Sequence, residues 1–265
     1  MALSANTKSV LARYLLNGYL LLFFGYLFLP LVLMVVAAFN TPAIPTVLPW
    51  RQFTLHWFTV LFDDAMIWDS VVNSLVIGAG VVVLAIPIGL SAALLLTRLQ
   101  SRSQPFLYAL LVSPILTPGV ILGISTLIFW NQMGLQGGLL LTVIGQTTFI
   151  ASFSMLIFMA QLQRLDPALE EAALDLGASH IQTYTRIIFP YLKATFVAAA
   201  FISFLQSFEN YNTTLFTIGA DRTMTVTIAS MIRLGLTPEV NALAVIFVGI
   251  TVIVAVLYTL LRKYD

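Results

Sequence analysis

Residues 171–177 read Glu171-Ala172-Ala173-Leu174-Asp175-Leu176-Gly177, and ten residues beyond that glycine the chain continues Ile187-Ile188-Phe189-Pro190. They belong to the one long polar segment of an otherwise apolar sequence. The 265 residues are 60% hydrophobic and 9% charged, with a mean hydropathy of +0.98. Soluble domains carry about 25% charged residues. We therefore expect lipid to be the solvent for most of this chain.

Six apolar segments have the length that a membrane-spanning helix needs, which is about 20 residues. They cover approximately residues 15–39, 71–96, 105–129, 138–161, 194–218 and 240–261. The sequence thus predicts an all-α polytopic membrane protein with six transmembrane helices, which form a single domain over residues 1–265. A short interfacial helix is expected near residues 225–234.

Positive charge is divided unevenly between the two sides of this predicted bundle. With the N-terminus inside, nine of the twelve Lys and Arg residues lie on the inner side, and the outer side has Arg51, Arg222 and Arg233. Cytoplasmic loops carry the excess of Lys and Arg in membrane proteins. Both termini and the polar loop are therefore expected in the cytoplasm.

Few residues of the sequence suit catalysis or metal binding. The chain has no cysteine, and its two histidines, His56 and His180, are far apart. It has no credible catalytic set and no Gly-x-x-x-x-Gly-Lys-Ser/Thr phosphate loop, and no basic patch suggests nucleic acid. We expect no enzyme activity, metal or cofactor on this chain, so that any ATP chemistry belongs to a partner.

The polar segment predicts two short helices that meet at a glycine. Asp166 can cap a helix that has Pro167 at its first position, and Gly177 suits a left-handed helix end. Ser179 can cap the second helix, and Pro190 leads into the fifth span. The small residues of the first helix would let another surface come close, although the helix could also lie on its own bundle.

This segment also resembles a known signature. The spacing of Glu171-Ala172-Ala173, Gly177 and Ile187-Ile188-Phe189-Pro190 is similar to the coupling loop of ABC-importer permeases, with Phe189 in place of the usual leucine. The openings of the second and sixth spans, at residues 73–75 and 237–244, are similar to the spermidine/putrescine-type permeases of that family.

The resemblance implies a type I ABC importer permease fold in a bacterial inner membrane. It implies a second permease subunit, by family habit in a heterodimer, together with two ATPase subunits that bind ATP and Mg, and an external solute-binding protein. The loop over residues 163–193 would then couple this chain to the ATPase through Glu170, Glu171, Ala172, Ala173, Asp175, Gly177, Ala178 and Pro190.

The fifth span contains the one clear carboxylate expected inside the membrane, Glu209. A charge in the bilayer core is costly, so it should face the bundle interior or water. On a continuous helix, three- and four-residue spacing places Glu209 on the same face as Gln206, Asn210 and Thr213. A carboxylate beside aromatic rings suits a cation. The predicted substrate pathway comprises Gln206, Glu209, Asn210, Tyr211 and Thr213. Glu209 could instead pair with a partner subunit or cap a break in the helix.

Polyamine-type relatives usually have two adjacent acidic residues at this place, where this chain has Glu209-Asn210. The predicted function is the permease subunit of an ATP-driven importer for a small cationic or amine-bearing, polyamine-like solute. Singly charged amines, quaternary ammonium compounds and opine-like or amino-acid-like solutes stay open. The alternative is a stand-alone secondary carrier or channel, which would need intramembrane ion-coupling residues and often shows repeated halves.

Overall fold

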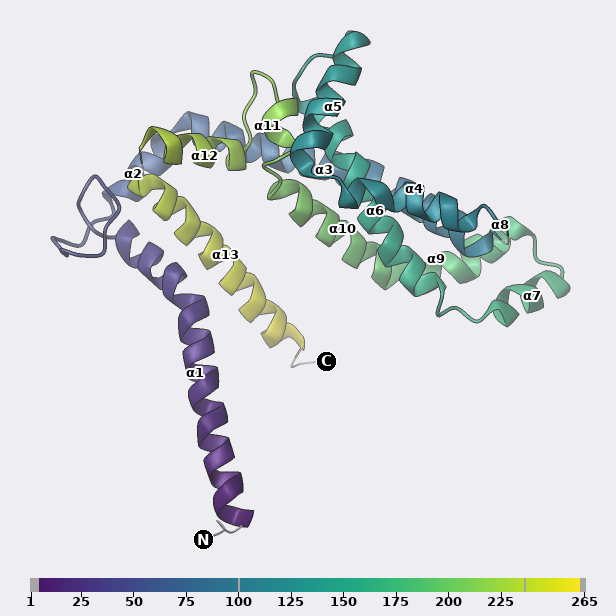
Figure 1. Ribbon diagram of the computed structural model, residues 1–265, viewed down its shortest axis with the longest axis horizontal. Helices are drawn as coiled ribbons and strands as arrows, with labels where there is room; N and C mark the ends of the chain where they lie inside the picture. The colour runs from purple at the N-terminus through teal and green to yellow at the C-terminus, as the bar shows by residue number, and fades with distance from the viewer. Residues whose placement is uncertain (1–4, 100, 236, 263–265) are drawn as a thin grey trace. The chain divides into compact units, whose positions relative to one another are not determined.

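The computed structural model describes residues 5–99, 101–235 and 237–262, and every regular element within them is a helix (Figure 1). The all-α prediction is confirmed. In chain order the elements are α1 (Ala5–Ala38), α2 (His56–Asp63), α3 (Ala65–Arg98), α4 (Gln104–Leu116), α5 (Gly119–Gln132), α6 (Leu139–Leu162), α7 (Pro167–Asp175), α8 (His180–Thr183), a π-helical turn (Tyr184–Ile188), α9 (Phe189–Tyr191), α10 (Lys193–Phe208), α11 (Thr214–Thr217), α12 (Met224–Leu234) and α13 (Pro238–Arg262).

Several of these helices are long and apolar enough to cross a membrane. Among the described residues, three helices qualify alone, namely Arg13–Ala38 within α1, together with α3 and α6. Two more qualify if the bent pairs α4–α5 and His180–Tyr191 with α10 each count as one span. The sixth predicted span coincides with α13, and the count of six crossings stays a prediction. A helix, α12, is present where the interfacial helix is predicted, and its place at the membrane interface stays a prediction.

Two of the predicted spans are interrupted. The span predicted over 105–129 is divided at Thr117 and Pro118 into α4 and α5, whose axes differ in direction by 102°. A proline in a helix interior removes one backbone donor and clashes with the preceding turn. The span predicted over 194–218 stops at Phe208, and α11 is a separate short helix. The prediction of one continuous fifth helix is therefore wrong.

The described chain divides into two compact units. The first consists of residues 1–65 and 230–265, and in its described part α13 packs against α1 and α2. The buried side chain of Asn40 organises the loop after α1, because its Oδ1 accepts from the Arg51 N–H at 3.0 Å and its amide donates to the Thr46 carbonyl. The prediction of a single domain stays a prediction.

The second unit, residues 66–229, contains both predicted sites. Its core lies where α3, α6 and α10 pack together, in two clusters that include Leu96, Met155, Phe158, Leu192 and Ala199, and Ile77, Val81, Ala85 and Ile150. At Gly89 an added Cβ would lie 2.6 Å from the Ser154 Cβ and 2.7 Å from the Met155 nitrogen. Small residues allow such close approach between membrane helices.

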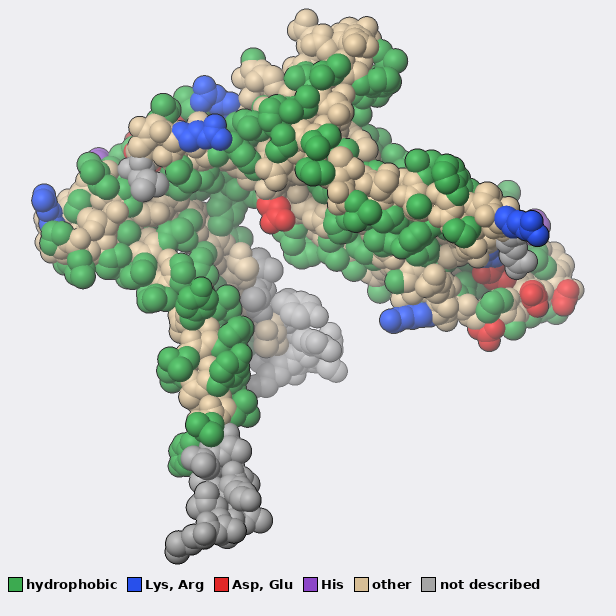
Figure 2. All heavy atoms as spheres, in the orientation of Figure 1, with side chains coloured by type: hydrophobic (Ala, Val, Ile, Leu, Met, Phe, Trp, Pro, Cys, Tyr) green, Lys and Arg blue, Asp and Glu red, His purple; other side chains and the backbone are tan. Residues whose placement is uncertain are grey.

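The surface of this second unit separates apolar from charged side chains. Hydrophobic side chains cover much of the visible surface of α4, α6 and α10, whereas charged side chains gather near α7 (Figure 2). Large exposed side chains include Phe106 and Leu110 on α4, and Val197 and Phe201 on α10. Apolar surface of this extent, with charge at one end, is typical of helices that lie in lipid.

Candidate functional site

The loop over residues 163–193 begins with a helix that local interactions specify. Asp166 caps α7, because its Oδ1 accepts from the Ala168 N–H at 3.0 Å. Gly177 ends the turn that follows α7 with φ +85°, a conformation that costs other L-residues free energy. Ser179 and Gln182 then form a reciprocal capping box at the start of α8. The predicted caps and glycine turn are confirmed.

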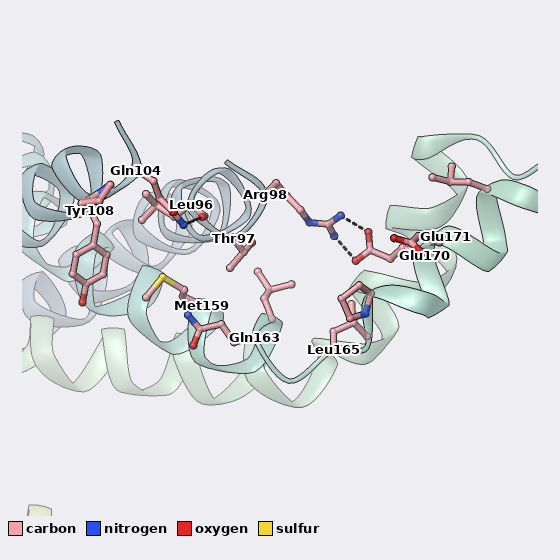
Figure 3. Close-up of a pocket in the computed structure, with 14 residues that line it drawn as sticks. Leu96, Thr97, Arg98, Gln104, Tyr108, Met159, Gln163, Leu165, Glu170 and Glu171 are labelled. Carbon is pink, nitrogen blue, oxygen red and sulfur yellow. Dashed lines mark hydrogen bonds and ion pairs between the residues drawn. The ribbon is translucent and has the colours of Figure 1, made fainter. Parts of the chain in front are cut away.

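The helix α7 is held at the surface. None of its nine residues, all within the described chain, is buried. One side lines a cavity of about 850 Å³ through Pro167, Glu170, Glu171 and Leu174 (Figure 3). Of the other predicted coupling residues, Ala173 and Ala178 are half-buried, and those that are exposed are Ala172, Asp175, Gly177 and Pro190.

The cavity beside α7 extends to three other helix ends. It is lined by Leu96, Thr97 and Arg98 of α3, by Gln104, Pro105 and Tyr108 of α4, and by residues at the end of α6 (Figure 3). Across it, the Arg98 guanidinium donates to both carboxylate oxygens of Glu170. The two residues are 72 positions apart. Sequence reasoning missed this pair because no local spacing relates its members.

A second cavity lies at the break in the fifth predicted span. It has a volume of about 430 Å³ and is lined by Phe149, Phe153, Gln206, Glu209, Asn210, Tyr211 and Asn212. Glu209 occupies the C-cap position of α10 and is exposed, whereas Gln206, Asn210 and Tyr211 are half-buried. The structure thus brings four of the five predicted pathway residues together, beside two phenylalanines of α6 that sequence reasoning missed.

The fifth predicted pathway residue, Thr213, lies apart from this cavity. Its side chain is fully buried, and its Oγ1 donates to the Gly119 carbonyl at 3.2 Å. A Cβ added at Gly123 would lie 2.8 Å from the Thr213 carbonyl oxygen. The prediction that Thr213 shares a polar face with Gln206, Glu209 and Asn210 is therefore wrong, because α10 ends before Glu209 and Thr213 lies against α5.

Buried hydrogen bonds from α6 stabilise this break. The Gln146 amide donates to Thr214 Oγ1 at 2.7 Å and accepts from Ser207 Oγ, so that one side chain links both sides of the break. Asn210 Oδ1 accepts from the Thr213 N–H at 3.1 Å, which orders the turn into α11. In sequence Gln146 stands beside Thr147 and Thr148 within a largely apolar segment, and this pattern gives no indication of its partners.

Residues 85–264 match the family described as binding-protein-dependent transport system inner membrane component. The chain belongs to this family. It is 27% identical over 255 residues to the spermidine/putrescine transport system permease protein PotC of Escherichia coli (strain K12), with 96% of each chain covered. It is 28% identical over 238 residues to the putrescine transport system permease protein PotI of the same strain, which covers 87% of this chain and 84% of PotI.

The fold also has a counterpart among solved structures. A bacterial ABC transporter involved in the import of the acidic polysaccharide alginate has a chain that matches all of this one, and all of its own length, with a TM-score of 0.72. At 14% sequence identity this likeness shows the fold alone.

The predicted resemblance to inner-membrane permeases of ABC importers is confirmed by the family match. This match favours the importer permease over the stand-alone carrier or channel, and the family is one of transport permeases rather than enzymes. Within the described ranges, no three His, Asp or Glu side chains come together in a way that could hold a metal ion.

Proposed function

We propose that this permease forms half of a solute path through the bacterial inner membrane, and that two ATPase subunits drive it through residues 163–193. The observation that carries the proposal is the exposed helix pair α7–α8, which has its own caps and glycine turn, in a chain of the binding-protein-dependent family. Local caps set the shape of this loop and most of its side chains stay exposed, and this favours a docking role.

The ATPase would contact the apolar side chains that this loop leaves exposed. Leu176 is 89% and Ile181 74% exposed, at the charged end of the second unit. Exposed apolar residues within a polar rim are typical of protein interaction sites. The small residues Ala172, Ala173, Gly177 and Ala178 would allow close approach, with Glu171 and Asp175 at the rim. ATP and Mg would bind to the ATPase, because this chain has no phosphate loop.

Movement of this loop would be transmitted to the solute path through the helices that follow it in sequence, α9 and α10. Pro190 lies in α9, between the π-helical turn and α10, where the axis bends by 65°. At its other end α10 stops beside the cavity that Glu209 lines. A displacement of α8 and α9 would therefore pass through one rigid helix to the proposed solute contacts.

The solute would be a small amine-bearing cation that meets Glu209. A carboxylate beside Phe149, Phe153 and Tyr211 can hold an ammonium group by charge and by cation–π contact. Gln206 and Asn210 would contribute polar contacts in the same cavity. The names of PotC and PotI, which refer to spermidine and putrescine, support a polyamine or a related amine.

The remaining parts of the transporter follow from the same proposal. A second, related permease would complete the path as a heterodimer, and an external binding protein would deliver the solute on the side opposite α7. Both termini would lie in the cytoplasm, as the excess of Lys and Arg on that side favours.

The proposal is tested by uptake of labelled putrescine into proteoliposomes that contain this chain, its partner permease, the ATPases and the binding protein. We expect uptake to require both ATP and the binding protein. Glu209→Gln should lower uptake by about tenfold or more, since a lost charge contact is worth about 1.5–3 kcal/mol, and Glu209→Asp should retain more of it. Gradient-driven uptake by this chain alone, without ATPase, would refute the importer mechanism.

A further inference from the structure

Among the described residues, Glu170 has a charged partner, unlike the other acidic residues of the predicted coupling set. The two oxygens of its carboxylate pair with the two terminal nitrogens of the Arg98 guanidinium (Figure 3). The Glu170 side chain is 14% exposed and that of Arg98 is 42% exposed. A two-pronged Arg–carboxylate contact fixes orientation as well as distance. Glu170 is thus directed toward α3 and the cavity rather than toward an external surface.

The two helix ends that meet here are electrostatically complementary. Arg98 is in the last turn of α3, and Glu170 is in the first turn of α7. A cation near a helix C-terminus and an anion near an N-terminus are each favoured by the helix dipole. The ion pair therefore joins two helix ends whose own partial charges favour the same contact.

The end of α3 is itself a fixed point in the second unit. Gln104 Nε2 at the start of α4 donates to the Leu96 carbonyl at 2.9 Å, which secures the last turn of α3. Further along α3, an added Cβ at Gly89 would meet the α6 backbone, and at Gly78 it would lie 2.8 Å from the Phe204 ring of α10. A movement applied at Arg98 would therefore reach both α6 and α10.

We propose that Arg98 and Glu170 are positioning residues that tie α7 to the end of α3, so that a displacement of α7 carries α3 with it. This inference rests on the proposed role of α7 as the element that the ATPase engages. It assigns Glu170 to a contact inside the permease, and it gives the displacement a second route to the Glu209 cavity, beside the direct route through α9 and α10.

The first test measures putrescine taken up per ATP hydrolysed in the reconstituted transporter. Arg98→Gln and Glu170→Gln should each lower this ratio about two- to thirtyfold, the range of measured coupling effects, while the ATPase stays attached. Exchange of the charges, in Arg98→Glu combined with Glu170→Arg, should restore the ratio in part, because the ion pair forms again while each charge then opposes its helix dipole. An unchanged ratio in the single variants, or no recovery in the exchange, would overturn the inference. If a single variant fails to accumulate in the membrane, the charge-exchanged double variant decides the question. The inference predicts that this double variant accumulates and takes up putrescine.

The second test needs no solute, and the absence of native cysteines makes it possible. Spin labels on Ser101→Cys, just after α3, and Ala168→Cys, in α7, report the distance between the two elements. With Arg98 in place, this distance should be the same in the nucleotide-free and the ATP–vanadate-trapped transporter, and Arg98→Gln should make it change or broaden. A distance that changes in the parent chain, or stays fixed in Arg98→Gln, would contradict the tie.

The two proposals fail separately. If α7 cannot be cross-linked to the ATPase in the parent transporter, the proposed coupling role of the loop is wrong. If that cross-link forms and the Arg98 and Glu170 variants keep the parent ratio and distance, only the tie between α7 and α3 is wrong.

Discussion

The turn at Gly177 and the break after Phe208 both interrupt helical structure, but by different means. At Gly177 the conformation depends on neighbours in sequence, and among the described residues no atom lies within 4 Å of an added Cβ. At the break, Thr213, Thr214 and Thr217 are fully buried. A locally specified and exposed turn can hold its shape while another protein contacts it, whereas a break held by neighbouring helices is part of the bundle's own packing.

The comparison also predicts how substitutions in the two regions affect stability. Exposed segments with few buried contacts open locally, at low free energy, whereas buried networks open together with the unit that contains them. Substitutions at the break should therefore destabilise the whole second unit. Substitutions at Gly177 should affect the α7–α8 loop alone.

The largest effect is expected from Gly123→Ala. Its Cβ would lie 2.8 Å from the Thr213 carbonyl oxygen and 3.1 Å from the Thr213 Cα, and neither backbone atom can move without disturbing the break. Overpacking of this kind costs about 1–3 kcal/mol, and we expect about 3 kcal/mol in the free energy of unfolding. Thermal unfolding in detergent measures it. Gly25→Ala, in α1, where no described atom lies within 4 Å of the added Cβ, should not lower the midpoint and should raise it slightly, because Ala is the better helix former. Equal midpoints for both variants would remove the claim that the break depends on close packing.

Gln146→Leu should have the next largest effect. It removes two buried hydrogen bonds across the break, and a buried polar group that loses its partner costs about 1–3 kcal/mol. We expect a loss of about 2 kcal/mol by thermal unfolding, together with reduced uptake. Gln132→Leu, at the exposed end of α5, is the control. A Gln146→Leu variant as stable as this control would mean that local sequence alone sets the break.

Gly177→Ala should cost less and act locally. At φ +85° a residue with a Cβ loses about 1–2 kcal/mol, and we expect about 1 kcal/mol. Asn tolerates this conformation better, so Gly177→Asn should lose less. Hydrogen exchange should show faster opening of α7 and α8, with the rates in α6 and α10 unchanged. Faster exchange in α6 as well would contradict the claim that local interactions specify this turn.

Glu209→Gln should have the smallest effect on stability. The side chain is exposed at the end of α10, and surface substitutions usually change stability by less than about 0.5 kcal/mol. Unfolding should thus be nearly unaffected while putrescine uptake falls. A large loss of stability would favour the alternative interpretation, in which the carboxylate holds the helix break instead of contacting solute.

The turn at Gly177 depends on local interactions and the break after Phe208 on distant ones, and this difference decides how far the sequence predicts each region. Asp166, Pro167, Gly177 and Ser179 specify the loop through local rules, so that its two helices and their caps could be predicted. For the break after Phe208 the sequence offers only an alternative, in which Glu209 caps it, because the hydrogen bonds that Gln146 supplies come from 61 positions away. The predicted pathway residues still came together, because Gln206, Glu209, Asn210 and Tyr211 lie within six residues of one another.

The ion pair across the larger cavity illustrates the same limit. The sequence places Arg98 only on the inner side, and Glu170 only in the predicted ATPase-coupling set. Their contact requires the end of α3 to reach the start of α7. Such a contact depends on helix packing, which charge counts and caps do not predict.

The most direct test of the central claim is cysteine cross-linking in the assembled transporter. Since the chain has no cysteine, Leu176→Cys provides a unique thiol beside Gly177, and Ile44→Cys provides one in the exposed loop after α1. The account predicts that Leu176→Cys cross-links to the ATPase subunit, with a yield that changes when ATP and vanadate are added, whereas Ile44→Cys does not cross-link to it. No cross-link from Leu176→Cys in a particle that hydrolyses ATP and imports solute would contradict it.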